Sequence, residues 1–156
     1  MAEPVAERPY IAHKEYGIPD DTETLLPWSW AAERFSESRN FWIAAASPDG
    51  TPTARPVWGV FVDDTVFFGG GPLTRWSRYL EHNPKVSLHL ESGEKVVIAE
   101  GEVDRITEAS DPRLTKVDDA YEVKYEMRHG PPIWVLRPTM VLAWSEFPKT
   151  MTRFRF

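Results

Sequence analysis

The 156-residue chain has no cysteine, no long apolar run and no excess of positive charge. Without cysteine there is no disulfide, no thiolate metal site and no Cys nucleophile. No stretch approaches the roughly 20 apolar residues of a membrane-spanning helix. The net charge of −6 argues against general nucleic-acid binding, which needs a basic surface. We therefore expect a cytoplasmic protein that binds neither membranes nor nucleic acid.

The signatures of several enzyme classes are missing as well. The stretch "GGGPLT" has neither the G-x-G-x-x-G spacing of dinucleotide sites nor the G-K-[ST] of a P-loop, and no G-x-S-x-G elbow occurs. The four histidines, which are His13, His82, His89 and His129, show no H-x-x-x-H spacing. The sequence therefore gives no support to those nucleotide folds, to a serine hydrolase or to a metal site.

The distribution of prolines and charges divides the chain in two. Residues 1–24 hold three prolines and many charges without periodicity, which predicts a loosely ordered N-terminal arm outside the fold. Residues 25–156 are expected to form a single domain, because a chain of this size builds one core.

Apolar periodicity predicts the elements of that domain. Spacing of three and four residues predicts helices in "WSWAAERFSESRN", from Pro72 to Asn83, and from Leu114 to Tyr125. Alternation predicts six or seven short strands, with "FWIAAAS", "TARPVWGVFV" and "TVFFG" as a meander and "IWVLR" and "TMVLAWS" as two separate strands. Strands joined mostly by hairpins predict a mainly β fold, an antiparallel barrel with helices on its flanks.

The stretch "GGGPLTRWSRYLEHNP" concentrates cations where a loop turns into a helix. Arg75 and Arg78 lie three apart near the predicted helix start, where free N–H groups already favour an anion, and Thr74 adds a hydroxyl. Arg55 lies in a predicted strand, and arginine binds phosphate through paired, permanently charged donors. The pattern is typical of a phosphate site. The alternative is a solvated helix face in which Arg78 pairs with Glu81 or Glu91.

Aromatic residues are numerous for one small core: seven tryptophans, five tyrosines and eight phenylalanines. Some are therefore expected at a flat ligand or a subunit interface. Trp58 and Trp76, which neighbour the arginines, are the candidates for a ligand, with core packing as the alternative. Core packing is favoured for Trp28 and Trp30.

The order of these pieces resembles the pyridoxamine 5'-phosphate oxidase-like superfamily of split-barrel flavin and deazaflavin proteins. The resemblance runs from about Trp28 to Glu102, more loosely to the end, and rests on P-D-G-x-P, R-P-V-W, T-R-x-x-R-x-L, N-P-x-V and H-L-E-S-G. It implies a six-stranded antiparallel split β-barrel of the FMN-binding type and an intertwined homodimer. It also implies a cofactor groove at the subunit interface.

The resemblance also assigns site residues. The cofactor's phosphate is expected at Arg55, Thr74, Arg75 and Arg78, and the isoalloxazine-type ring beside Pro56, Val57 and Trp58, with Trp144 and Arg153 reaching in from the partner chain. Trp76 stands where many members have lysine, and it offers a stacking face and one N–H donor in place of a point charge. FMN is the expected cofactor, and the deazaflavin coenzyme F420 is the alternative.

The function implied is that of a flavin- or deazaflavin-dependent oxidoreductase, whose cofactor transfers a hydride or electron pair to or from a small organic substrate. No catalytic side chain is assigned, because the cofactor carries the chemistry. Pyridoxamine phosphate oxidation itself is not expected, since the family's C-terminal substrate-binding segment is not recognisable in "FPKTMTRFRF". One alternative is a non-catalytic carrier or sensor of flavin, deazaflavin or haem. Another is an interaction domain whose pocket is filled by Trp76.

Overall fold

A long hairpin forms the spine of the computed structural model, which describes residues 2–9 and 13–156. Its strands are β7 (Val96–Ile106) and β8 (Ile133–Trp144), which pair over their full length. The other strands are β1 (Val5–Glu7), β2 (Phe41–Ala46), β3 (Pro52–Val57), β4 (Gly59–Val62), β5 (Thr65–Phe68), β6 (Lys85–His89) and β9 (Thr152–Arg155). The helices are α1 (His13–Tyr16), α2 (Trp28–Glu37), α3 (Arg75–His82) and α4 (Leu114–Tyr125).

All strand pairs are antiparallel, in the order β1-β9-β8-β7-β6-β2-β3, with β5 joining β8 to β4. The sheet divides at β8, because one end of this strand pairs with β5 and the other with β9. The expected mainly β architecture with flanking helices is confirmed as an open sheet consistent with a split barrel. The strand number differs from the prediction: the described residues form nine strands rather than six.

Two local features account for part of the difference in strand boundaries. The segments predicted as two strands, "IWVLR" and "TMVLAWS", are the single strand β8. Pro138 lacks an N–H, but it lies opposite Gly101 where the register shifts by a bulge, so the ladder continues past it. By contrast, the segment "TARPVWGVFV", predicted as one strand, forms two strands separated at Trp58. The first, β3, pairs with β2, and the second, β4, pairs with β5.

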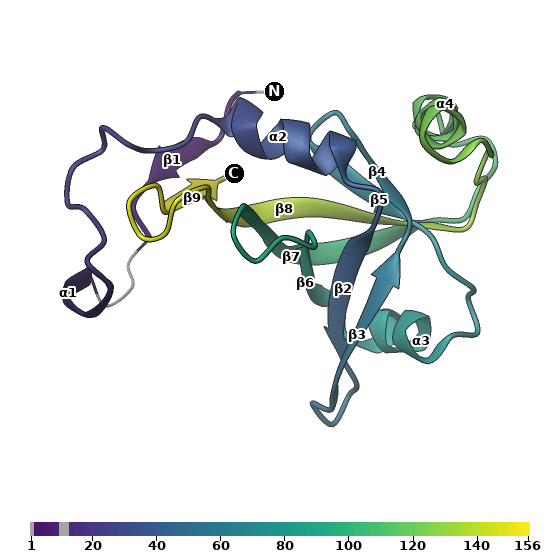
Figure 1. Cartoon of the computed structure of the whole chain (residues 1–156). Coiled ribbons are helices and arrows are strands. Elements are labelled where there is room, and N and C mark those ends of the chain that lie inside the picture. Colours follow the sequence, from purple (N-terminus) through teal and green to yellow (C-terminus); the bar gives the residue numbers. More distant parts are fainter. Residues whose placement is uncertain (1, 10–12) are drawn as a thin grey trace.

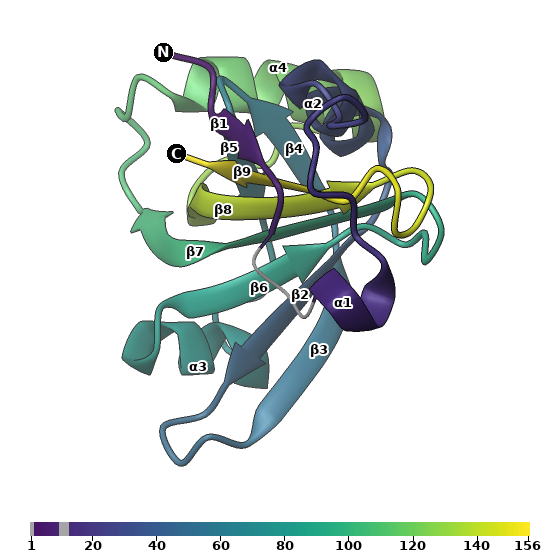
Figure 2. The same ribbon diagram turned by 90° about the vertical axis from the view of Figure 1, so that its left-hand side faces the viewer.

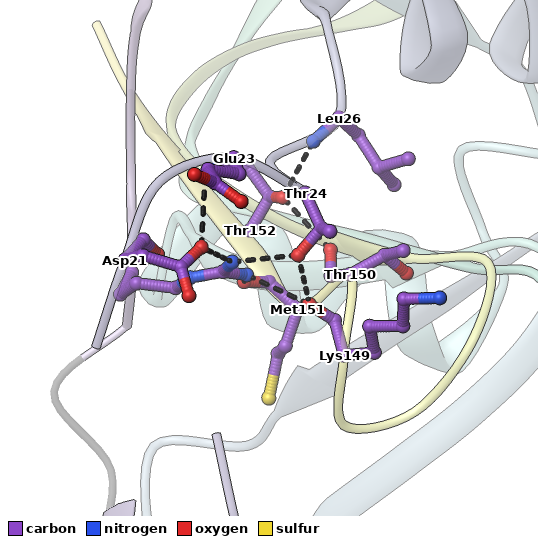
Figure 3. Close-up of polar contacts among 9 residues, drawn as sticks. Asp21, Glu23, Thr24, Leu26, Lys149, Thr150, Met151 and Thr152 are labelled. Carbon is purple, nitrogen blue, oxygen red and sulfur yellow. Dashed lines mark hydrogen bonds and ion pairs between the residues drawn. The ribbon is translucent and has the colours of Figure 1, made fainter. Parts of the chain in front are cut away.

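The segment predicted as an arm outside the fold contributes an edge strand. Val5 and Glu7 of β1 lie opposite Arg155 and Arg153 of β9. The buried guanidinium of Arg8 then donates hydrogen bonds of 2.8 to 3.0 Å to three main-chain carbonyl oxygens and one hydroxyl, those of Asp21, Lys149, Met151 and Thr24. Figure 3 shows Thr24 against Lys149 and Leu26 against Thr152 in the same region. The first 24 residues thus include a segment fixed to the C-terminal strand.

The three helices predicted from periodicity are confirmed, and two of them bury most or all of their apolar stripe. Phe35 and Ala31 of α2 are fully buried, and so are Val117 and Tyr121 of α4. Figures 1 and 2 show α2 and α4 on one side of the β7–β8 hairpin and α3 on the other. The main core lies between the sheet, α2 and α3, and a second cluster lies beneath α4. None of the described helices is long and apolar enough to cross a lipid bilayer.

Candidate functional site

One face of α3 lines a hollow of about 230 Å³. Arg75, Arg78, Tyr79 and His82 form this face, and Pro48 of the β2–β3 turn closes the other side. The four helical residues follow the spacing i, i+3, i+4, i+7, which places them on one stripe. The hollow therefore combines two permanent cations, an imidazole and a phenol.

The opposite face of α3 explains why the arginines point outward. Trp76, Ser77 and Leu80 are buried, and the Trp134 Nε1–H donates to Ser77 Oγ at 3.1 Å. Because this side is fixed in the core, the helix presents Arg75 and Arg78 to solvent.

Arg55 lies on the same side of the sheet as α3. In the β2–β3 pair it stands opposite Ile43, which is 1% exposed and belongs to the core cluster shared with Trp76 and Leu80. Cross-strand partners point to the same face, and α3 contacts both β2 and β3. The exposed guanidinium of Arg55 donates only to the carbonyl of Ala54, so it is near α3 but is not among the residues that line the hollow.

The positive charges of the arginines at and near the hollow are not balanced by carboxylates among the described residues. Within the part of the chain that the structure describes, Arg55, Arg75 and Arg78 form no ion pair. Glu81, one expected partner of Arg78, instead pairs with Arg105 at 2.8 Å. The charge of these arginines is thus left to solvent or to an external anion.

Thr74 occupies the N-cap position of α3, but its hydroxyl does not cap the helix. It donates to the carbonyl oxygen of Gly71 at 2.8 Å. The first turn of α3 contains no acidic residue. The N–H groups at this end therefore lack the side-chain acceptor that commonly satisfies them.

Trp76 lies in the core and not at the hollow. It is 7% exposed and packs on Phe68, with ring centroids 6.1 Å apart. A Cβ on Gly70 would lie 2.2 Å from its Cζ2 atom, so the glycine loop rests directly on the indole. This side chain neither presents a stacking face to solvent nor fills the pocket.

The three residues predicted beside the ring have different environments. Val57 is buried, Pro56 is exposed opposite Trp42, and Trp58 is 43% exposed. The Trp58 ring stacks on Tyr125 of α4, with centroids 4.6 Å apart and planes 6° apart, and Arg39 approaches it within 5.3 Å. Trp58 therefore packs toward α4 and not toward the predicted phosphate ligands Arg55, Arg75 and Arg78.

Trp144 and Arg153 are not brought to the arginines within one chain. Three strands, β7, β6 and β2, separate β8 from β3. Arg153 already pairs with Glu7 at 2.7 Å, and Trp144 contacts Phe147 edge to face at 5.9 Å.

Sequence reasoning missed Tyr79, His82 and Pro48 as lining residues of the hollow. A signal for the first two was present, because they continue the stripe begun by Arg75 and Arg78 at helical spacing. Pro48 had no such signal, since its position depends on where the β2–β3 turn meets α3.

The other face of the sheet carries an apolar patch, which we call the open face. It consists of half-buried side chains from four neighbouring strands: Trp42, Ala44, Ser87, His89, Ile98, Met140 and Leu142. Trp42, His89, Ile98 and Leu142 are successive cross-strand partners, and the Trp42 and His89 rings are parallel within 2°. Each of these side chains retains partial exposure, so the described helices leave the patch incompletely covered.

Comparisons with known proteins agree with this topology. The family model described as pyridoxamine 5'-phosphate oxidase matches residues 30–145. No curated protein sequence matches the chain.

Several solved structures share the fold. A conserved hypothetical protein from Mycobacterium tuberculosis is 18% identical, with 81% of this chain and 89% of that chain covered and a TM-score of 0.64. A haem-binding protein from Mycobacterium smegmatis is 19% identical, with 81% and 57% covered and a TM-score of 0.63. An F420 reductase is 20% identical, with 80% and 98% covered and a TM-score of 0.53. At sequence identities of 18 to 20%, these similarities show a shared fold and nothing more specific.

The family match extends beyond Glu102 through the whole of β8, so it includes the strand at which the sheet divides. Because it covers most of the chain, the protein belongs to the pyridoxamine 5'-phosphate oxidase family, in its split-barrel superfamily.

Proposed function

We propose that the protein is a homodimeric, cytoplasmic oxidoreductase that binds FMN, with the deazaflavin coenzyme F420 as the alternative cofactor, and acts on a small organic substrate. One observation carries this proposal: the uncompensated cations on the outer face of α3 and the neighbouring β3. In an acidic protein, three arginines on one side of a sheet without carboxylate partners favour an anionic ligand.

The hollow fits the phosphate end of such a cofactor. Its volume of about 230 Å³ is below the roughly 300 to 1,000 Å³ of sites that enclose a whole small molecule. Arg75 and Arg78 would hold the phosphate oxygens, the N–H groups at the start of α3 would add to them, and Arg55 would approach from β3. The ring would extend beyond the hollow along β3, past Pro56.

A bound flavin or deazaflavin supplies the transfer of the hydride or electron pair. The chain's own residues would bind and orient it: the arginines by neutralising the phosphate, and β3 by supporting one side of the ring. We assign no general acid or base. Exclusion of water from the ring would depend on a second copy of the chain.

The open face is where we propose that the second copy packs. Its half-buried apolar residues, with Trp42 and Leu142 near its two ends, resemble the centre of a subunit interface more than an ordinary surface. A second copy would bring its β8 toward the first copy's cofactor. Trp144 is the stronger candidate for a contribution from the partner, because Arg153 is held by Glu7.

A second candidate function is the binding of haem without turnover. His89 on the open face favours it: the ring Nδ1 lies 2.7 Å from the carbonyl oxygen of Leu90. If Nδ1 donates in this contact, Nε2 keeps a lone pair for a metal that brings its other ligands with it. The structural similarity to a haem-binding protein from Mycobacterium smegmatis, of which 57% is covered, supports this candidate.

Titration of the purified protein with FMN, riboflavin, coenzyme F420 and haem separates these candidates. For a phosphate role, Arg55→Ala and Arg78→Ala should each weaken FMN binding by about 1.5 to 3 kcal/mol, roughly ten- to a hundredfold, and leave riboflavin binding unchanged. Arg137→Ala, an exposed arginine outside the hollow, is the matched control. Unchanged FMN affinity in both variants would restore the solvated helix face as the explanation.

Turnover distinguishes an enzyme from a carrier. With dioxygen or a dye supplied as the electron acceptor, the cofactor-loaded protein is expected to oxidise many equivalents of a supplied reductant. A single equivalent without further turnover would support the carrier. Loss of the haem absorbance shift in His89→Ala, with FMN affinity retained, would support the second candidate.

A further inference from the structure

A half-buried lysine lines a groove at the end of the molecule away from α3. Lys124 of α4 donates a hydrogen bond from Nζ to the carbonyl oxygen of Gly59 at 2.9 Å. The same nitrogen lies 4.7 Å from the centroid of the Phe41 ring. Among residues 2–9 and 13–156, no carboxylate forms an ion pair with Lys124. The amine therefore has a carbonyl acceptor and an aromatic ring beside it but no carboxylate to balance a full positive charge.

The groove lies between α2 and α4 over β4 and has a volume of about 430 Å³. Its apolar wall consists of Val60, Phe61, Ala120 and Val123. Val123 is 89% exposed, although it is a large apolar side chain. The volume lies within the range of small-molecule sites. The groove is thus suited to a compound with an apolar body.

The charged and titratable groups around the amine do not favour its protonation. Arg39 follows α2, Tyr125 and Asp119 belong to α4, and β4 contributes none. Asp119 lines the groove, but its carboxylate is bound by Arg128 at 2.8 Å. Burial, and secondly the charge of Arg39, lower the pKa of Lys124 to about 8. Burial and a neighbouring cation are the two conditions that make a lysine amine nucleophilic near neutral pH.

We propose that Lys124 is the nucleophile of a second site, in which its amine condenses with the aldehyde or ketone carbon of a small apolar compound held in the α2–α4 groove. The Nζ lone pair forms a bond to the carbonyl carbon. The carbonyl oxygen leaves as water with the two amine hydrogens, and a C=N bond results. No electron is transferred, so the step needs no oxidant or reductant. Figures 1 and 2 show α2 and α4 at the other end of the molecule from α3. The groove and the α3 hollow have no lining residue in common.

Trapping with benzaldehyde and cyanoborohydride at pH 7, followed by peptide mass spectrometry, tests the proposal. Lys116 is the matched control, because it lies on the same helix, is 68% exposed and is paired with Asp63. A pKa of about 8 leaves about a tenth of the amine neutral at pH 7, against fewer than about one in a thousand for an ordinary lysine. We expect Lys124 to be modified at least about tenfold faster than Lys116, with a rate that levels off above pH 8.

Two variants separate the groove from the reactivity of the amine. Val123→Ser, a surface change that adds no charge beside the amine, should slow the benzaldehyde reaction at Lys124 and leave the reaction with formaldehyde unchanged. Lys124→Arg should abolish the fast modification and leave the other lysines as they were. A Lys124 rate at or below that of Lys116, or a rate that still rises through pH 10, would overturn the proposal. Equal effects of Val123→Ser on both aldehydes would overturn the role of the groove.

Discussion

Single residues around the glycine loop show how a local sequence feature takes its meaning from packing. The run Gly69-Gly70-Gly71 suggests a loop that lets backbone approach a phosphate. In the structure, Gly70 is instead required by Trp76, whose ring atoms occupy the space of a side chain at that position. Gly71 is different, because a Cβ there would meet only Thr74 Cγ2, at an ordinary 3.5 Å.

The pair Gly70→Ala and Gly71→Ala measures this difference. We expect Gly70→Ala to lower the free energy of unfolding by about 1 to 3 kcal/mol, because the buried indole must move away from the added methyl group. Gly71→Ala should be nearly neutral. Urea unfolding followed by tryptophan fluorescence gives both values. Equal stabilities would show that Trp76 is not held against the loop.

At the scale of elements, the N-terminal strand depends on the C-terminal one. β1 pairs only with β9, and Arg8 holds the loop that precedes β9 through the carbonyl oxygens of Lys149 and Met151. The Arg8 side chain is 7% exposed, so water does not readily replace these bonds. An isolated three-residue strand would be unstable without such a contact.

Arg8→Ala is therefore expected to destabilise the protein by about 3 kcal/mol, since four acceptors, two of them part-buried, lose their donor together. Arg155→Ala, which removes an exposed arginine paired with Glu7 in the same part of the sheet, should have little effect. Hydrogen exchange should show loss of protection in β1 and β9 before the rest of the sheet. If Arg8→Ala matches Arg155→Ala in stability, the contacts of Arg8 do not hold the segment in place.

At the scale of the whole molecule, the open face is the surface on which we propose that a second copy packs. An interface of two copies would bury the row of Trp42, His89, Ile98 and Leu142 and place two cofactor sites at its edges. A closed two-fold pairing uses the same patch on both copies, so a single charge introduced there appears twice.

Leu142→Glu should consequently convert a dimer into a monomer in analytical ultracentrifugation at micromolar protein. FMN binding should weaken at the same time if the partner completes the groove. Val123→Glu, on the exposed surface of α4, is the control and should leave the mass unchanged. A wild-type protein that is already monomeric would contradict the shared groove, as would a dimer that tolerates the Leu142→Glu change.

Much of the fold was predictable because its signals are local. Leu114, Val117, Tyr121 and Tyr125 mark α4 by spacing alone, and all four are buried as expected. The same local rules failed at Pro138, where a bulge within β8, with Thr139 unpaired between Pro138 and Met140, lets the strand continue. They also gave no indication that the Arg8 side chain would be buried, because two of its partners are the main-chain carbonyls of Lys149 and Met151, 141 and 143 positions away.

The sequence by itself determined the helices, the hairpins and a cluster of arginines at a helix start, since each depends on residues within a few positions of one another. The tertiary structure decided how those residues are used. Glu81 pairs with Arg105, Trp58 stacks on Tyr125, and Arg153 pairs with Glu7, 146 positions away. Because Glu81 pairs with Arg105, Arg78 lacks one of its expected partners. Trp76 is buried in the main core. Such choices depend on which strands become neighbours in the sheet, and that is set by long-range pairing rather than by local pattern.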